Sequence, residues 1–402
     1  MRTLHEAVLD GLPEDLAPAA RSQGGGAAMT GPGTTQSAVS RGQQARAGRA
    51  GSVRFAAGRA LPLFVRGRGS GGVRPAFTAD ALRALRARHG GAPVLVRGLS
   101  GAVLVLLDRQ ELRQFYEAGP ATAPAPALGA VPSRAAVRAV IAEEARHLTA
   151  AATLDLVRAR HAVARAARRI VLGGGGGGCD GEGGAGEEHP AGLFGRLRRR
   201  GAPEGHTPLG RSAAYAGRQG QVLRAMDAVP ATLLRTLLLL AAHPAEQDAA
   251  AAEAAGSGPA EDLPRLEACV RECLRLYPAV PDLVRVTRTE TEWRGVRHPA
   301  GTTVLLPAHF HQRDPEHVPA AHVFVPGRWK TPGADEDLRM APFGHGPGRC
   351  PGDRIGLLIT TALCAEVLRR RRITATRPVL DPPGPLPVAL DPRGIRLTLT
   401  RR

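Results

Sequence analysis

Cys350 lies in a loop whose composition suits a thiolate metal ligand. The segment PFGHGPGRCPGDRIG alternates glycines with other residues around this one cysteine, and prolines stiffen the loop. Glycines let a flat cofactor approach the backbone, and free amides in such a turn can point at a thiolate and tune it. The alternative is a structural turn before a helix that carries an incidental cysteine, and the loop alone leaves both interpretations open.

A glutamate and an arginine three residues apart form a second motif. Glu272 and Arg275 in ECLRLYP fall on one helix face, where they predict a buried ion pair. All of the 54 basic residues except Lys330 are arginine, so about one glutamate in eight has this spacing by chance. The order of motifs adds weight, because FVPGRW brings Arg328 about 50 residues later and Cys350 follows.

These motifs, in this order, resemble the cytochrome P450 family of haem-thiolate monooxygenases. The resemblance covers roughly residues 220–400 well and 77–170 weakly. The matching positions are Phe343, Gly346, Cys350 and Gly352 of the cysteine signature, Glu272 and Arg275 of the Glu-x-x-Arg pair, and Pro326, Arg328 and Trp329 of the Pro-x-Arg-aromatic segment. The resemblance implies an oxidoreductase with a mainly α fold, small β-sheets and an iron protoporphyrin, haem b.

By this resemblance Cys350 is the proximal ligand of the haem iron. A thiolate pushes electron density onto iron and favours cleavage of the O–O bond, which an imidazole does less well. Glu272, Arg275 and Arg328 are then a buried network that holds the cysteine loop. Loss of one charge from such a network leaves the other charges buried without compensation.

The resemblance also implies contacts to the haem carboxylates. Arg285, in LVRVT, matches the position from which family members often reach a propionate. Gly348 occupies the site of the usual arginine or histidine, and Arg349 stands one place late, so a second propionate contact departs from the family pattern. The expected cofactor-binding residues are Cys350, Phe343, Gly346, Gly352, Arg285 and Arg349.

The apolar helix predicted before His243 looks like the central helix of the family. Counting back from His243 places Asp227 and Ala228 where most members carry an acid followed by threonine, a pair that organises the water delivering protons. Pro230 predicts a kink in this helix. Thr232 replaces the missing alcohol if that kink turns it inward, and the alternative is an exposed Asp227 on a kinked core helix.

The amino-terminal half departs further from the family. The chain has only two tryptophans, both late, so the family's Trp-x-x-x-Arg helix is absent in that form. A glycine-rich linker at 173–188 falls where helices over the substrate pocket are expected. The resemblance therefore implies a haem site that is more open than usual or that binds haem poorly.

Hydrophobic periodicity predicts mostly helices with a few strands. The expected helices cover 77–90, 108–119, 133–148, 153–172, 220–243, 261–278 and 355–368. Strands are expected at 94–98 and 102–108, within 283–306 on either side of 295–302, and in a terminal hairpin around 391–394. The fold class is mainly α with small β-sheets.

Two domain-level segments stand out. Residues 1–54 contain no aromatic residue and predict a basic disordered arm, while 55–402 form the haem domain interrupted by the linker at 173–188. A basic arm can bind nucleic acid, but without aromatic side chains to stack bases a solvated tail is favoured.

Composition limits the remaining classes. The 402 residues carry a formal charge of +18, and 43% hydrophobic residues are enough for a core. Five cysteines without a CxxC pair argue against a disulfide scaffold. No secretory signal is visible at the start, and the longest apolar runs fall short of the ~20 residues that cross a bilayer, so a cytoplasmic protein is expected.

Several weaker sites have simpler explanations. Cys269 and Cys273 lie one helical turn apart, but two buried small side chains are favoured over a metal pair. His309 and His311 are expected to pack rather than to bind metal. A cluster that could attract an acidic electron donor such as a ferredoxin, or that is merely solvated, comprises Arg339, Arg349, Arg354 and the run 369–372.

The resemblance implies a monooxygenase that inserts one atom of dioxygen into a small apolar substrate. No flavin or nicotinamide domain is evident, so electrons would come from an external ferredoxin and its reductase or a similar donor. One alternative is a catalytically silent haem-binding or sensor protein that kept Cys350. The other is a basic nucleic-acid-binding protein led by the arm at 1–54.

Overall fold

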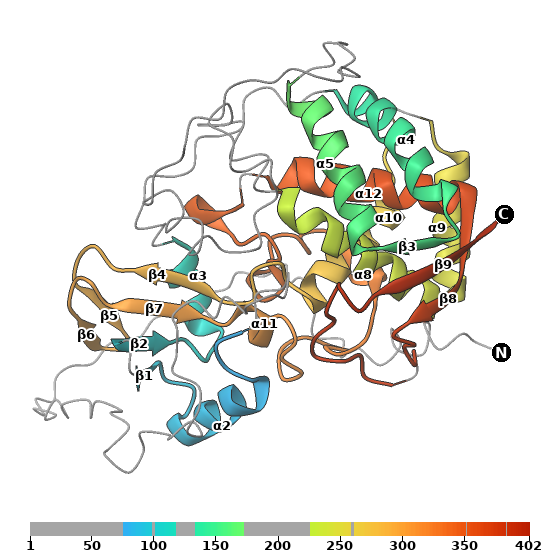
Figure 1. Cartoon of the computed structure of the whole chain (residues 1–402). Coiled ribbons are helices and arrows are strands. Elements are labelled where there is room, and N and C mark those ends of the chain that lie inside the picture. The colour runs from blue at the N-terminus through green and yellow to red at the C-terminus, as the bar shows by residue number, and fades with distance from the viewer. Residues whose placement is uncertain are drawn as a thin grey trace, which may run out of the picture.

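The computed structural model describes residues 75–98, 101–117, 133–172, 226–258, 261–350, 352–382 and 384–402 (Figure 1). The arm expected at 1–54 and the linker expected at 173–188 lie outside the described residues.

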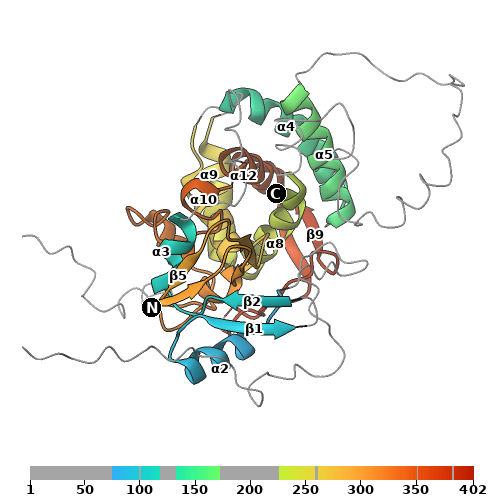
Figure 2. The same cartoon turned by 90° about the vertical axis from the view of Figure 1, so that its left-hand side faces the viewer.

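Among the described residues, six long helices form one packed layer, and two shorter helices flank the main sheet. The helices of at least eight residues are α2 (Ala79–His89), α3 (Gln110–Glu117), α4 (Arg134–Ala150), α5 (Leu156–Leu172), α8 (Val229–Ala242), α9 (Pro244–Gly256), α10 (Pro264–Leu276) and α12 (Asp353–Arg370). Figures 1 and 2 show α4 and α5 side by side at the outside of this layer. Leu237 to Leu240 of α8 are fully buried at its centre. A helix that is apolar over most of its surface, as α8 is, needs such a central position.

Proline sets both ends of α8. Residues Met226–Ala228 form a 3₁₀ turn, α8 begins at Val229, and Pro230 stands in its first turn. The kink predicted at Pro230 is wrong, because a first-turn residue has no intrahelical N–H bond to lose. At the other end His243 leaves the helical region (φ −122°, ψ 80°), as a residue before proline tends to do.

The chain bends by 118° between the segment 226–242 and α9. Among the described residues, no single helix is long and apolar enough to cross a membrane, and only this bent pair passes that test when its two parts are taken together.

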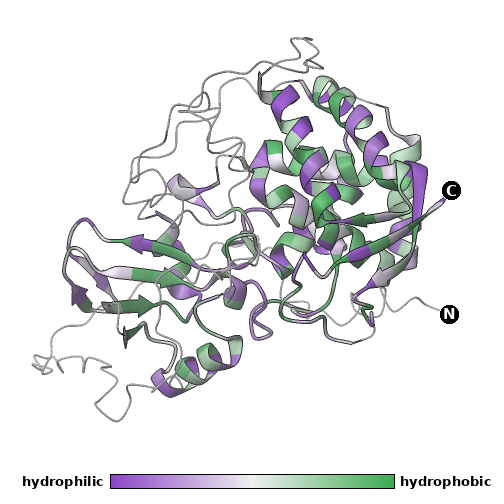
Figure 3. Cartoon of the chain, viewed as in Figure 1, coloured by the Kyte–Doolittle hydropathy of each residue, from purple (hydrophilic) through white to green (hydrophobic). Residues whose placement is uncertain are grey.

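A four-stranded sheet joins distant parts of the chain. Its order is β1 (Val94–Gly98), β2 (Gly101–Val105), β7 (Thr303–Leu306) and β4 (Leu283–Val286). β1 and β2 form the expected hairpin, β2 runs parallel to β7, and β7 pairs antiparallel with β4. Figure 3 shows β2 and β7 as largely hydrophobic strands. Both faces of this sheet are therefore covered.

Alternate residues of β2 and its extension enter two different cores, as the two-residue period of a strand requires. Val103, Val105 and Leu107 pack with Leu82 and Leu85 of α2. On the opposite face, the second core holds Leu104, Leu106, Leu112, Phe115 and Tyr116. The strand thus anchors α2 on one face and α3 on the other.

The described part of the chain also contains two smaller sheets. They are β3 (Thr153–Asp155), β9 (Arg396–Arg401) and β8 (Arg371–Arg377) in one, and the hairpin of β5 (Thr291–Trp293) and β6 (Val296–His298) in the other. The helix expected from residue 153 begins at Leu156, because 153–155 pair with β9. The segment 283–306 contains four strands, with β6 inside the stretch expected to separate them. The expected mainly α fold class with small sheets is confirmed.

Short turns connect the sheet to the long helices. They are α11 (Ala308–His311), η5 (Pro326–Lys330), η6 (Leu338–Met340) and η7 (Gly346–Gly348). All four come from the segment between β7 and α12, which also carries Arg328 and Cys350.

Candidate functional site

The Glu272–Arg275 pair of α10 is fully buried. Both side chains have 0% exposure, and Arg275 donates from Nε to Oε2 of Glu272 at 2.9 Å and from Nη2 to Oε1 at 2.8 Å. This bidentate geometry is the strong form of an arginine–carboxylate ion pair. The helix spacing therefore produces the contact that the sequence predicted.

The same carboxylate receives three further donors from the segment 325–329. Arg328 Nε lies 3.1 Å from Oε1, the Val325 amide 3.0 Å from Oε1, and the indole nitrogen of Trp329 2.9 Å from Oε2. Burial alone would raise the pKa of Glu272, but Arg275 and Arg328 hold the pKa below its ordinary value. The carboxylate is thus charged and tied to α10 and η5 at once.

Arg275 extends this network toward the cysteine loop. Its guanidinium donates to the carbonyls of Gln312, Ala321 and Val323 at 2.7, 2.9 and 3.1 Å. The side-chain amide of Gln312 in turn donates to the carbonyl of Ala341 at 3.1 Å. Glu272 and Arg275 therefore act on the loop through Gln312 and do not touch the cysteine.

The cysteine loop closes on itself through backbone bonds. The Cys350 amide donates to the Phe343 carbonyl at 2.8 Å, and the Arg349 amide to the Gly346 carbonyl at 3.0 Å. Gly344 and Gly346 have φ of 73° and 61°, where other residues are strained. A Cβ on Gly346 would lie 2.9 Å from the Tyr116 carbonyl oxygen, so glycine is needed for this loop to approach α3.

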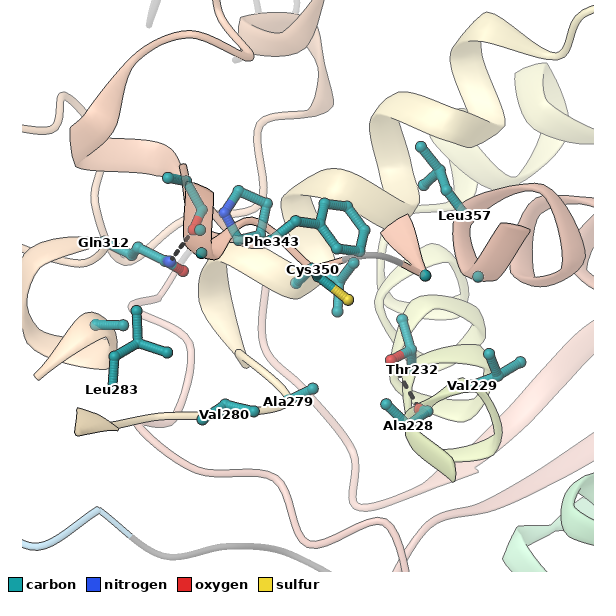
Figure 4. Close-up of a pocket in the computed structure, with 18 of the residues that line it drawn as sticks. Ala228, Val229, Thr232, Ala279, Val280, Leu283, Gln312, Phe343, Cys350 and Leu357 are labelled. Atoms are coloured by element: carbon teal, nitrogen blue, oxygen red, sulfur yellow. Dashed lines mark hydrogen bonds between the residues drawn. The ribbon is translucent and has the colours of Figure 1, made fainter. Parts of the chain in front are cut away.

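A cavity of about 600 Å³ lies over the cysteine. Figure 4 shows the Cys350 side chain beside Phe343, with the first turn of α8 across the space from it. Burial raises the pKa of the Cys350 thiol, a shift partly opposed by the Gly352 amide. Much of the lining is aliphatic, including Val229, Val270, Leu274, Leu283, Val284 and Leu357.

The first turn of α8 forms the wall that faces the cysteine. Thr232 is buried, lines the cavity, and donates its hydroxyl to the Ala228 carbonyl at 3.0 Å. Ala228 and Val229 line the cavity beside it. Asp227 is half-buried in the 3₁₀ turn just before, and it is not a lining residue. The structure therefore places Thr232 at the cavity, although no kink turns it there.

Arg285 of β4 brings a positive charge to the cavity. Its guanidinium lies 4.2 Å from the centre of the Phe115 ring and donates to the Phe115 carbonyl at the end of α3. Burial lowers the pKa of Arg285. Among the described residues no carboxylate lies within 4.0 Å of this guanidinium, so it can pair with an anionic group of a ligand.

The other residues expected to bind the cofactor divide into two groups. Phe343, Cys350 and Gly352 line the cavity with Arg285, whereas Gly346 and Arg349 do not. Arg349 Nε instead lies 2.6 Å from Asp353 Oδ2 at the start of α12. Its role at a propionate is therefore not supported by this arrangement.

Buried thiols and histidines of the weaker sites all have packing environments. Cys269 and Cys273 are completely buried, and burial raises the pKa of each. His309 Nδ1 contacts the Pro281 carbonyl, and His311 Nε2 contacts the Leu106 carbonyl. Burial lowers the pKa of His311 to about 4. These contacts support the packing interpretation.

The arginines expected near the cysteine loop do not form one surface. Arg339 and Arg349 are paired with Asp337 and Asp353, and Arg354 is exposed. The run 369–372 lies at the opposite end of α12, which spans about 27 Å at 1.5 Å per residue. Grouping this run with the loop is wrong, because the full length of α12 separates the two in space.

Two residues of the site have no signal in the sequence. Gln312 is buried and lines the cavity, and its Oε1 has no hydrogen-bond partner among the described residues. Tyr116 is buried against the cysteine loop, and its carbonyl fixes the approach of Gly346. Neither residue is part of a recognisable sequence motif. Each is identified only from the three-dimensional positions of α3 and α11.

The donor set fits haem b. A flat apolar ring needs an aliphatic cavity, its iron needs an axial ligand, and its carboxylates need cations. The cavity supplies the Val and Leu lining, the Cys350 thiol beside a glycine-rich turn, and the guanidinium of Arg285, which forms no ion pair with a described carboxylate.

Comparisons with known proteins agree with this chemistry. Residues 223–399 match the family described as cytochrome P450. The chain is 37% identical over 188 residues to cyclooctat-9-en-7-ol 5-monooxygenase of Streptomyces melanosporofaciens, covering 42% of this chain and 40% of the relative. Pentalenene oxygenase of Streptomyces avermitilis is 33% identical over 147 residues, covering 35% of this chain and 33% of the relative.

A similar match extends to an animal protein. Thromboxane-A synthase of Mus musculus is 32% identical over 162 residues, covering 37% of this chain and 30% of the relative. The chain thus spans less than half the length of each of these relatives.

Proposed function

We infer that the chain, which belongs to the cytochrome P450 family over residues 223–399, is a haem-thiolate monooxygenase. It would insert one oxygen atom of dioxygen into a small apolar molecule, with electrons from an external donor. The observation that supports this best is the Cys350 side chain at an aliphatic cavity whose opposite wall is a buried central helix. Two of the relatives are named as a monooxygenase and an oxygenase, which supports the same reaction type.

Four residues are proposed to hold the cofactor. Cys350 would ligate the iron, Phe343 and Gly352 would contact the ring, and Arg285 would pair with a propionate. When bound, the haem supplies an iron that binds and activates dioxygen, and the thiolate favours cleavage of the O–O bond. The network of Glu272, Arg275 and Arg328 keeps the cysteine loop in place for this ligation.

The substrate side of the cavity favours an uncharged molecule. Around the start of α8 and the segment before β4, the lining is made of small aliphatic residues such as Val229, Ala279 and Val280. No aspartate, glutamate or lysine lines the cavity among the described residues. A charged substrate would lose its hydration there without gaining a partner, apart from an anion at Arg285.

Proton delivery is assigned to the start of α8. Thr232 donates its hydroxyl proton to Ala228, so its oxygen remains able to accept a hydrogen bond from a water in the cavity. Asp227 stands in the adjoining turn, where it can pass protons toward such a water. The roles of Thr232 and Asp227 are both proposed from where these residues lie at the start of α8.

The electron donor is proposed to be an acidic protein such as a ferredoxin that docks near the cysteine loop. Arg354 is exposed there, whereas Arg339 and Arg349 are already paired with the carboxylates of Asp337 and Asp353. The attraction would therefore be weaker than the number of arginines suggests.

A carbon monoxide difference spectrum tests the proposed function. The purified protein, loaded with haem and reduced under carbon monoxide, is expected to show the strongly red-shifted Soret band of a thiolate-bound carbonyl. Cys350→Ala should lose this band. Cys364→Ala, which changes a buried cysteine of α12 outside the cavity, is the matched control and should keep it. A colourless parent protein, or an unchanged spectrum in Cys350→Ala, would overturn the assignment.

A second candidate is a haem-binding protein without turnover. It is favoured by the alanine at 228 and by the use of the Thr232 hydroxyl within its own helix turn. Peroxide or surrogate electrons supplied with a panel of apolar substrates separate the two candidates. Product formation supports the monooxygenase, and a rate that Asp227→Asn leaves unchanged removes the role given to Asp227.

A further inference from the structure

A second cavity, of about 250 Å³, lies between α4, α12 and the segment that joins α9 to α10. It shares no lining residue with the Cys350 cavity. Its polar lining consists of Arg138, Ser257, Glu366 and Arg369. Figure 1 shows α4 and α12 as neighbours in the helical layer.

Arg138 lacks the partners that its guanidinium needs. Its Nη1 donates to the Gly258 carbonyl at 2.6 Å, but its Nε is buried and has no hydrogen-bond partner among the described residues. No carboxylate of the described part of the chain forms an ion pair with it. Burial, together with the nearby charges of Arg134 and Arg369, lowers the pKa of Arg138.

The single carboxylate of this cavity is already neutralised. Glu366 pairs through Oε1 with Arg369 and through Oε2 with Arg370, the latter at 2.9 Å. Nη1 of Arg370 is also buried without a hydrogen-bond partner. Among the described lining residues there are two arginines, Arg138 and Arg369, and one carboxylate, Glu366, so the lining itself has an excess of one positive charge that an anion would compensate. Asp262 and Glu261 act on Arg138 from outside the lining and offset part of the effect of its neighbouring arginines.

The rest of the lining is apolar. It comprises Ala139, Ala142, Leu263, Ala362 and Ala365. Along α12 the lining changes from alanine at 362 and 365 to charged residues at 366 and 369, a rise of about 10 Å from first to last. A ligand that fills the cavity would meet methyl groups along one part of its length and guanidinium groups along the other.

We propose that this cavity binds a small organic carboxylate. Arg138 would bind the carboxylate oxygens, and the alanine side chains would surround a short alkyl chain. Arg369 already donates to Glu366 and, from Nε and Nη2, to the Ala254 carbonyl, so it would contribute its positive charge and no new hydrogen bond. The planar fork of a guanidinium matches a carboxylate with two parallel bonds, and it would give the buried Nε of Arg138 its missing acceptor. The alanine wall favours an alkyl carboxylate over inorganic phosphate, because burying the chain removes apolar surface from water.

Isothermal titration calorimetry of the full purified chain tests this site. Butyrate is expected to bind at one site with millimolar affinity. Sodium chloride at matched ionic strength should produce no saturable heat, and inorganic phosphate should bind more weakly than butyrate. No saturable heat with butyrate, or tighter binding of phosphate, would overturn the carboxylate assignment.

Three variants locate the binding. Arg138→Gln is expected to weaken butyrate binding at least about tenfold, because it removes a charge-assisted pair. Ala142→Leu fills the cavity while keeping every charge, so it should weaken binding independently of any effect on the guanidinium groups. Arg146→Gln, an exposed arginine on the same helix outside the cavity, should bind butyrate as the parent does. Parent-like binding by the folded Arg138→Gln or Ala142→Leu protein would refute the site.

Discussion

The two walls of the Cys350 cavity are held in place by different means. The cysteine wall, which we define as residues 312 and 341–350 with the supporting network of Glu272, Arg275 and Arg328, is fixed by buried charge-assisted bonds. The α8 wall, residues 226–232, is held mainly by apolar packing. Its polar contacts include the bond from the Thr232 hydroxyl to the Ala228 carbonyl and that from the Cys273 thiol to the Thr232 carbonyl. The geometry for holding a metal ligand is thus set by polar groups, while the facing geometry is set mainly by the hydrophobic core.

This difference has an energetic consequence. Five donor groups converge on the Glu272 carboxylate, so removing its charge leaves buried guanidinium groups without compensation. In the α8 wall the Thr232 hydroxyl bonds within its own helix turn, so removing that hydroxyl should cost little stability. The four predictions below test that contrast, beginning with the largest effect.

Glu272→Gln should destabilise the protein by about 3–5 kcal/mol, because it leaves Arg275 and Arg328 buried and unpaired. Urea unfolding followed by circular dichroism measures the change. Glu267→Gln on the same helix breaks the half-exposed pair with Arg271 and should cost less than about 1 kcal/mol. Equal costs for the two variants would remove the special role of the buried network.

Gly346→Ala should destabilise the folded state by about 2–3 kcal/mol through both backbone strain and contact with α3. The Cβ would lie 2.9 Å from the Tyr116 carbonyl oxygen at a φ of 61°. Gly333→Ala separates the two contributions, since Gly333 also has a positive φ but open space around its Cβ. We expect this control to cost about 1 kcal/mol, and thermal denaturation compares the pair. No difference between them would mean that the loop does not depend on α3.

His311 should make stability fall in mild acid. Burial lowers the pKa of its imidazole to about 4 in the folded state, below its ordinary value of 6.5. The unfolded chain therefore takes up the proton first, and the contribution to stability present above about pH 6.5 is lost as the pH falls toward 4.

Between about pH 7 and pH 5 the expected loss from His311 is about 2 kcal/mol. Urea unfolding at several pH values measures it, and His311→Asn should remove this part of the pH dependence. The same slope in parent and variant would show that His311 titrates normally.

Thr232→Val should change stability by less than about 1 kcal/mol, because the hydroxyl makes only a bond within its own helix turn. The valine keeps the shape of the threonine side chain in the cavity. Chemical denaturation measures stability, and haem titration checks that cofactor affinity is unchanged. A loss as large as that of Glu272→Gln would contradict the contrast between the two walls.

The parts of the site that could be predicted from sequence are those fixed by short-range spacing. Glu272 and Arg275 meet because residues three apart share a helix face, and the cysteine loop is recognisable from its glycines. Arg328 lies far along the chain, and its place in the network was available only through the resemblance of motif order. The periodicity of hydrophobic residues likewise predicted most helices, including α10 and α12, to within a few residues.

The remaining features depend on long-range contacts or on exact helix ends. Pro230 predicts a kink if α8 begins earlier, but a proline in the first turn of a helix has no such effect. Residues 153–155 resemble the start of a helix until β9, more than 200 residues later, pairs with them. Tyr116 contributes to the site through its main-chain carbonyl, and Gln312 through its side-chain amide. Because such groups occur throughout any sequence, neither residue could be singled out before the fold was known.

The parallel pairing of β2 with β7 bears on how the chain is made. Nearly 200 residues separate Val105 from its partner Leu305, so a ribosome adding about 5–20 residues per second needs roughly 10–40 s to supply the second strand. During that interval the β2 edge of the first hairpin lacks the strand that pairs with it in the folded protein. Nascent chains of this protein should therefore be good clients for chaperones that shield strand edges.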